Sequence, residues 1–124
     1  MTFQLERLDH IQLSAPKGSE KTAREFYKDI LGFMEEEKPK TLKPNGGVWF
    51  RKGEIAIHIG IEEPFEPLKK AHPAFDVSGI DALQIYLEKA GVSTKSDNKL
   101  PNARRFYVRD PFGNRLEFLE WQGK

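Results

Sequence analysis

The chain has 124 residues, 38% of them hydrophobic and 11% aromatic, which predicts one packed domain over residues 1–124 and excludes a disordered chain. Its 20 basic and 19 acidic residues leave a formal net charge of +1, so neither nucleic acid nor an anionic membrane is an expected partner. Cysteine is absent, which excludes disulfides, a thiol nucleophile and thiolate metal ligands. The sequence shows neither a signal peptide nor an apolar run long enough to span a membrane, so we expect a cytoplasmic protein.

The first half of the chain predicts a strand, a helix and three further strands. Residues 8–14 form the first expected strand, with His10 and Gln12 on the face opposite its apolar side chains. Apolar residues then recur at helical spacing from the expected N-cap Ser19 to Gly32, which stands where a helix C-terminal glycine belongs. The remaining strands are predicted at 33–36, 48–51 and 54–61, and His58 faces away from the isoleucines of the last one.

The second half repeats this order after a proline-containing connector at 62–70. His72 begins a strand that ends at 77, on the face opposite Phe75. A helix follows, with Ser78 as its expected N-cap and Asp81 placed as in a capping box. The other expected elements are a short strand at 92–95, a polar loop at 96–102, and a hairpin with strands at 106–109 and 116–121 around an Asp-Pro-Phe-Gly-Asn turn.

Glu117 lies on the last expected strand and faces away from Leu116 and Phe118, the two residues that should pack on the core. A carboxylate fixed in this way suits a metal ligand or a general base. On its own, however, it is more typical of a solvated strand residue.

The two halves form an internal repeat with the order β-α-β-β-β. FYKDILGF in the first half matches IYLEKAGV in the second, and WFR matches YVR. This predicts an α+β fold of two modules, over about residues 5–62 and 71–122. The same alignment places His10 opposite His72, and His58 opposite Glu117.

These four repeat-equivalent residues include every histidine of the chain. Imidazole and carboxylate together suit Zn, Ni, Co, Mn or Fe. The sequence therefore predicts one divalent metal ion bound by His10, His58, His72 and Glu117. Glu117 is also the expected proton carrier.

Three segments, LDHIQL, AHPAFDV and YVRDPFGNRLEF, resemble the vicinal oxygen chelate superfamily, which contains glyoxalases, bleomycin resistance proteins and extradiol dioxygenases. The resemblance covers nearly the whole chain. It implies that the paired modules form a cupped mixed sheet around a divalent metal, with ligands from the first and fourth strand of each module. It also implies a small-molecule substrate and a homodimer.

The resemblance leaves the reaction open. The leading hypothesis is a glyoxalase-family metalloenzyme that acts on a small oxygen-chelating substrate by lyase, isomerase or thiol-adduct chemistry. Glyoxalase I has a glutamate where this chain has His58, which argues against its own isomerisation. The alternatives are a ligand-sequestering protein of the bleomycin-resistance type, a fosfomycin-type thiol transferase and a ring-cleavage dioxygenase.

Two further residues are candidates for the substrate pocket. Gln12 shares the expected face of His10, and Trp121 shares that of Glu117. Five arginines are candidates for binding an anionic group of the substrate, because a guanidinium binds such groups in bidentate fashion: Arg51, Arg104, Arg105, Arg109 and Arg115.

Overall fold

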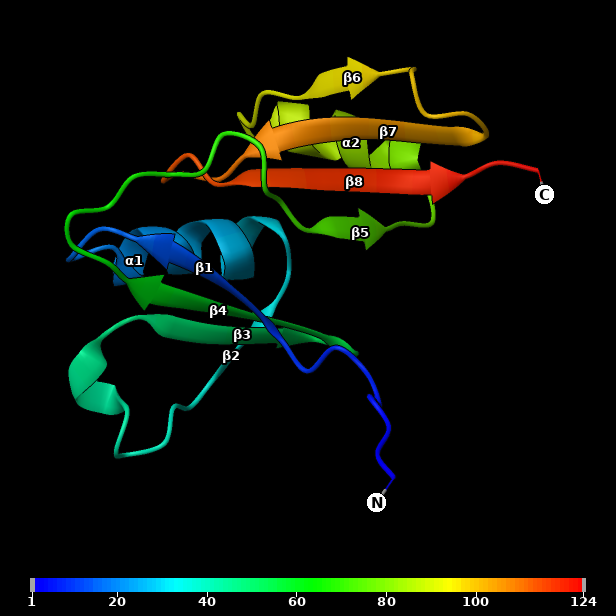
Figure 1. Cartoon of the computed structure of the whole chain (residues 1–124). Helices are drawn as coiled ribbons and strands as arrows, with labels where there is room; N and C mark the ends of the chain where they lie inside the picture. The colour runs from blue at the N-terminus through cyan, green and yellow to red at the C-terminus, as the bar shows by residue number, and fades with distance from the viewer. Residues whose placement is uncertain (1, 124) are drawn as a thin grey trace. The chain divides into compact units, whose positions relative to one another are not determined.

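The computed structural model describes residues 2–123, and none of their helices is long and apolar enough to cross a membrane. The chain divides into two compact units, of which unit 1 ends at Glu63 and unit 2 begins at Pro64. Each unit combines a four-stranded mixed sheet with helical structure between its first two strands (Figure 1). This confirms the predicted α+β fold and its repeated β-α-β-β-β order.

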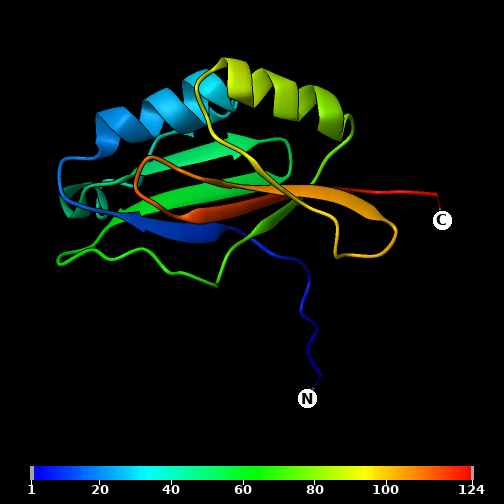
Figure 2. The same ribbon diagram turned by 90° about the horizontal axis from the view of Figure 1, so that it is seen from above.

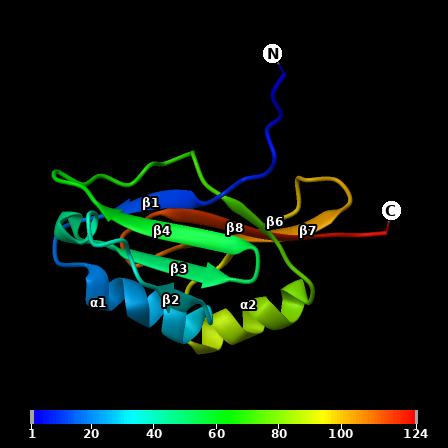
Figure 3. The same ribbon diagram turned by 90° about the horizontal axis from the view of Figure 1, so that it is seen from below.

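The sheet of unit 1 has the strand order β1-β4-β3-β2. Figure 3 shows β4 between β1 and β3. β1 runs parallel to β4, and the other two pairs are antiparallel. The elements of this unit are β1 (Ile11–Ala15), α1 (Glu20–Ala23), η1 (Arg24–Ile30), β2 (Met34–Glu36), η2 (Lys43–Asn45), β3 (Val48–Lys52) and β4 (Ile55–Ile61).

The predicted first helix consists of an α-helical turn, α1, that continues as the π-helical segment η1. It packs along one side of the sheet (Figure 2), where the buried Tyr27 ring lies 5.5 Å from the Phe50 ring between centroids. Gly32 follows with φ +81°, a conformation that favours glycine. The predicted C-terminal glycine is therefore correct, whereas the expected N-cap Ser19 makes no side-chain capping bond.

The sheet of unit 2 has the equivalent order β5-β8-β7-β6. β5 is parallel to β8, and the other pairs are antiparallel. In Figure 1, α2 lies behind β7 and β8. The elements of this unit are β5 (Ala74–Asp76), α2 (Ile80–Lys89), β6 (Lys95–Asp97), β7 (Ala103–Arg109) and β8 (Arg115–Trp121).

The last hairpin gives unit 2 two distinct sheet faces. Phe106 is paired with Phe118, and both are buried on one face. Tyr107 is paired with Glu117 on the opposite face. The turn between β7 and β8 forms as predicted, because the Asp110 carboxylate accepts hydrogen bonds from two backbone N–H groups within it.

The N-terminus of α2 is capped differently from the prediction. Gly79, with φ +82°, is the N-cap, and no side chain of the helix start caps it. Instead, the Glu120 carboxylate on β8 accepts hydrogen bonds from the backbone N–H groups of Gly79 and Ile80 at 3.2 and 3.0 Å. The expected cap Ser78 is wrong, because a carboxylate distant in sequence satisfies the free N–H groups.

Several strand boundaries also differ from the prediction. β1 begins at Ile11 and β5 at Ala74, so His10 and His72 precede their strands. Beside His72, Pro73 has no N–H to continue the ladder, although its carbonyl accepts the Glu117 N–H. β6 lies at 95–97 instead of 92–95, because its residues pair with β7.

Candidate metal and substrate site

His72 and Glu117 form a close pair on unit 2. Their Nε2 and Oε1 atoms are 2.8 Å apart, and the Glu117 side chain is only 7% exposed. The other ring nitrogen of His72, Nδ1, lies 2.7 Å from the Lys70 carbonyl. A carbonyl only accepts hydrogen bonds, so this contact places a proton on Nδ1 and leaves Nε2 directed at the carboxylate.

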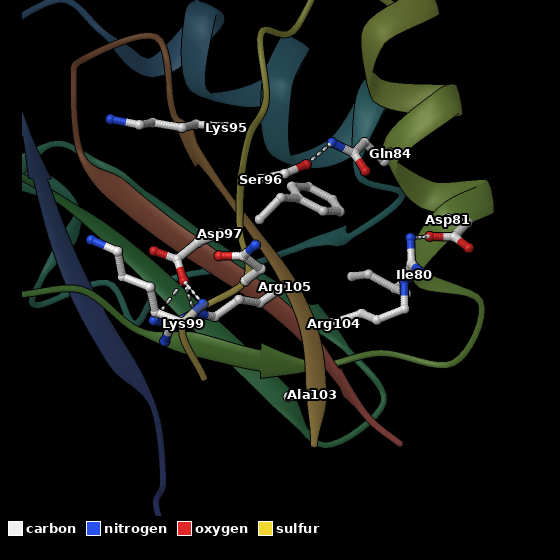
Figure 4. A pocket seen from close by; sticks show the side chains of 12 residues that line it. Ile80, Asp81, Gln84, Lys95, Ser96, Asp97, Lys99, Ala103, Arg104 and Arg105 are labelled. Carbon is white, nitrogen blue, oxygen red and sulfur yellow. Dashed lines mark hydrogen bonds and ion pairs between the residues drawn. The ribbon is translucent and has the colours of Figure 1, made fainter. Parts of the chain in front are cut away.

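Arg105 holds the second oxygen of the same carboxylate. Its Nη1 donates to Glu117 Oε2 at 3.3 Å, while Nε and Nη2 donate to Asp97 Oδ1 at 3.2 and 3.1 Å. Figure 4 shows the Arg105 guanidinium turned toward Asp97. The backbone N–H of Lys99, followed by Arg105, lowers the pKa of Asp97, which keeps Asp97 ionised opposite the guanidinium.

Tyr107 lies beside this carboxylate as its partner across β7 and β8. The His72 ring meets the Tyr107 ring edge-on, with 5.4 Å between centroids. The guanidinium carbons of Arg105 and Arg115 lie 5.4 and 4.2 Å from the centre of the Tyr107 ring. Unit 2 therefore presents an imidazole, a carboxylate and an aromatic ring on one face, flanked by arginines.

On unit 1, the equivalent positions form an aromatic stack. The His58 ring lies 3.8 Å from the Trp49 ring with an interplanar angle of 4°. It lies 4.0 Å from the His10 ring with an angle of 17°. Because both neighbours are nearly parallel to it, His58 is enclosed between them.

This stack limits how the two histidines can bind metal. An imidazole binds an ion through a nitrogen lone pair that lies in the ring plane, with the ion about 2.0–2.1 Å away. Two nearly parallel rings 4.0 Å apart cannot both point at one such ion. Binding by both His10 and His58 requires one of the rings to leave the stack.

The two histidines also differ in their surroundings. His10 Nδ1 lies 2.9 Å from the Asp9 carboxylate, and its side chain is 39% exposed. Its Nε2 therefore remains for another ligand. His58 is buried; this burial, with a smaller contribution from the charge of His10, lowers the pKa of His58 and favours the neutral imidazole that a metal requires.

The strand registers support the repeat alignment. In unit 1, the parallel pairing of β1 and β4 places His58 opposite Gln12. In unit 2, the parallel pairing of β5 and β8 places Glu117 opposite Ala74. His10 and His72 each come two residues before those partners. Across the antiparallel pair, Trp49 is opposite His58 just as Tyr107 is opposite Glu117.

The two predicted pocket residues have different surroundings. Gln12 and Trp49 both line a hollow of about 450 Å³ on unit 1. The Gln12 side chain lies so close to Gly60 that a Cβ there would come within 2.2 Å of Gln12 Nε2. Trp121 is 48% exposed at the end of β8.

Within residues 2–123, no group of three or more histidine or acidic side chains is gathered closely enough to hold a metal ion. The structure brings His10 to His58 within unit 1, and His72 to Glu117 within unit 2. The set of four ligands stays a prediction. Sequence analysis missed Asp9 and Asp97. Asp97 lies beside Arg105 through the pairing of β6 with β7, which no local sequence pattern signals.

The family model described as Glyoxalase/Bleomycin resistance protein/Dioxygenase superfamily matches residues 7–118. The chain belongs to this superfamily. A crystal structure of a protein from Bacillus anthracis assigned to the glyoxalase family is 47% identical, with a TM-score of 0.94 over 98% of this chain and 100% of the other. No curated protein matches the chain.

Two solved structures of lower sequence identity share the fold. The genomically encoded fosfomycin resistance protein of Listeria monocytogenes is 18% identical, with a TM-score of 0.77 over 98% of this chain and 96% of the other. An antibiotic-binding protein from Streptomyces is 19% identical, with a TM-score of 0.76 over 98% of this chain and 100% of the other.

Proposed function

We propose that this superfamily member is a metal-dependent enzyme whose donor set is His10, His58, His72 and Glu117. The observation that carries the proposal is the His72–Glu117 pair. Two ligands at about 2.1 Å from one ion and at right angles to each other would lie about 3 Å apart. The 2.8 Å between Nε2 and Oε1 is close to that spacing.

The hydrogen bonds around the donors support the same function. Metal-binding histidines commonly donate their other N–H to a carbonyl or carboxylate, which fixes the ring. His72 has such a contact with the Lys70 carbonyl, and His10 with the Asp9 carboxylate. In both rings Nε2 is the nitrogen that remains for a metal.

The bound ion would supply Lewis acidity toward the oxygens of a small substrate. Glu117 would then carry a proton to or from the substrate. Arg105 holds the Glu117 carboxylate in position, and the Tyr107 ring beside it supplies an apolar wall. This fits lyase or isomerase-type chemistry on an oxygenated substrate, in a homodimeric protein.

The alternative function is ligand sequestration without catalysis. The antibiotic-binding Streptomyces protein with the same fold favours it, as does the Trp49–His58–His10 stack, which offers a flat aromatic surface. Against it stand the fixed rings of His10 and His72, because orienting their Nε2 atoms serves a metal better than it serves stacking.

Zinc titration followed by Trp49 fluorescence tests the proposed role of His58. The chain has two tryptophans, so a Trp121→Phe background leaves Trp49 as the only indole. If His58 is the ring that leaves the stack to bind the ion, it moves off the Trp49 face and the emission changes with zinc occupancy. His58→Ala in the same background should abolish that change.

The outcomes separate the parts of the proposal. Zinc bound according to dialysis without a change in Trp49 emission would show that His58 stays against Trp49, and undiminished zinc binding by His58→Ala would then remove His58 from the donor set. No zinc bound by the parent protein, with no binding of Ni²⁺, Co²⁺ or Mn²⁺, would instead favour sequestration.

A further inference from the structure

A second hollow, of about 460 Å³, opens on unit 2 between the edge strand β6 and the turn after β7. Its lining carries an excess of positive charge, with four basic side chains and one acidic side chain. The charged residues are Lys69, Lys95, Arg109, Arg115 and Asp97.

The positive charges of this hollow are not balanced. Its one carboxylate, Asp97, is held by Arg105. Among residues 2–123, no carboxylate lies within 4.0 Å of the basic nitrogens of the four lining cations. The chain as a whole has 20 basic and 19 acidic residues, so this local excess comes from the folding of unit 2 and favours an anion.

Two arginines of the hollow are held in place without being neutralised. The Arg115 guanidinium lies over the Tyr107 ring, and its Nη1 donates to the Lys70 carbonyl at 3.4 Å. Arg109 Nη1 donates to the carbonyls of Leu68 and Gly113 at 3.3 and 3.1 Å. A guanidinium has five N–H donors, so most donors of both remain for an oxyanion.

The hollow adjoins the His72–Glu117 pair. Tyr107 lines it and is the direct strand partner of Glu117, and Lys95 is the partner of Tyr107 on the other side. Arg115 precedes Glu117 by two residues on β8, so both side chains point to the same face. Figure 4 shows Ser96 turned toward α2 instead, away from Lys95 and Asp97.

We propose that Arg115, Arg109, Lys95 and Tyr107 form an anion-binding subsite beside Glu117. The substrate would carry a carboxylate, phosphate or phosphonate group that these residues hold while its other oxygens face the metal. The statement that the other oxygens face the metal rests on the proposed function, whereas binding of the anion itself does not.

Inorganic phosphate and acetate are suitable probes, each titrated into metal-free protein in the presence of a chelator. Chemical shifts of the backbone and arginine N–H groups would locate the bound anion. Arg115→Gln should weaken binding by about tenfold, because a charge-assisted hydrogen bond is lost. Arg115→Lys should retain most of the binding, which separates loss of charge from loss of folding.

Arg104→Gln is the matched control. Arg104 lies on the neighbouring strand β7 and on the opposite face of the sheet, where it pairs with Asp81 of α2 (Figure 4). This variant should bind both anions as the parent protein does. Stronger binding of phosphate than of acetate would indicate a phosphate or phosphonate group in the substrate, and the reverse order a carboxylate.

Equal weakening by Arg115→Gln and Arg104→Gln would overturn the subsite, and so would shifts that map away from Tyr107 or no anion binding at all. Anion binding by a protein that takes up no divalent ion would leave the subsite standing and remove the metal function. Metal binding without anion binding would leave the metal function standing and remove the subsite.

Discussion

At the scale of the residue, Glu117 combines two properties that the sequence suggested separately. It faces away from Phe118 as the strand alternation predicts, yet it is 5% exposed and bonded to both His72 and Arg105. The idea of a solvated strand carboxylate is therefore wrong. The alternation gives the face of a side chain, but only the folded unit shows which charges surround it.

Replacing Glu117 with Gln should weaken metal binding and reduce turnover further. The amide is a poorer ligand and cannot carry the proton, and a general base typically contributes about 10²–10⁴-fold in rate. Calorimetric metal titration and kinetics at saturating metal would measure the two effects. Unchanged metal affinity and turnover in the variant would remove Glu117 from the site.

The same variant should also lower the stability of the metal-free protein, because Arg105 would then face a neutral amide. A hydrogen bond to a charged group contributes about 1.5–3 kcal/mol. Strand alternation alone would predict little change in the stability of this variant. The structure revises that expectation, since the carboxylate is buried.

His58 should make the stability of the metal-free protein depend on pH. Burial lowers its pKa in the folded state below the ordinary value of 6.5, so protonation favours the unfolded chain. The contribution of neutral His58 is complete above about pH 6.5 and is lost as the pH falls toward the lower folded pKa. Urea unfolding of the parent protein and of His58→Phe, at about pH 7.5 and about pH 5.5, would measure it.

His58→Phe preserves an aromatic ring between Trp49 and His10 while it removes the titrating group. The variant should therefore lose less stability on acidification than the parent does. An identical loss in the two proteins would show that other groups account for the pH dependence.

At the scale of the element, periodicity predicted the number and order of the strands and the main helix of each unit, but it missed the short helix η2 in the segment expected to be a loop. It failed at the ends of elements, where distant partners decide. The Glu120 carboxylate caps α2 from β8, and no local pattern around Ser78 could have revealed that contact. In the same way, β6 lies where β7 offers it backbone partners.

Glu120→Ala should destabilise unit 2 through the start of α2. Loss of a helix N-cap typically costs about 1 kcal/mol, and two backbone N–H groups lose their acceptor here. Ser78→Ala is the control and should change stability by less than about 0.5 kcal/mol. Urea unfolding would measure both, and a larger loss in the serine variant would restore Ser78 as the cap.

At the scale of the whole molecule, the internal repeat is the most informative feature of the sequence. It predicts that His10, His58, His72 and Glu117 occupy equivalent places, and the strand registers agree within each unit. The repeat does not predict how the equivalent pairs differ. His58 is stacked between rings, whereas Glu117 is bonded to charged groups, because the neighbours are aromatic in unit 1 and basic in unit 2.

The net charge also does not show where the charged side chains lie on the folded protein. A value of +1 excludes a basic protein, but it does not reveal the cations gathered beside Tyr107. Strand alternation places Arg109 and Arg115 on the same sheet face as Glu117, but only when the register between β7 and β8 is known.

Metal stoichiometry tests the central claim most directly. Metal-free protein would be dialysed against Zn²⁺, Ni²⁺, Co²⁺ or Mn²⁺ in turn, and the bound metal measured by elemental analysis for the parent protein, His72→Ala and Arg104→Gln. The account predicts about one tightly bound ion per donor set in the parent and in Arg104→Gln, and a large loss in His72→Ala. No bound ion in the parent, or equal binding in His72→Ala, would contradict it.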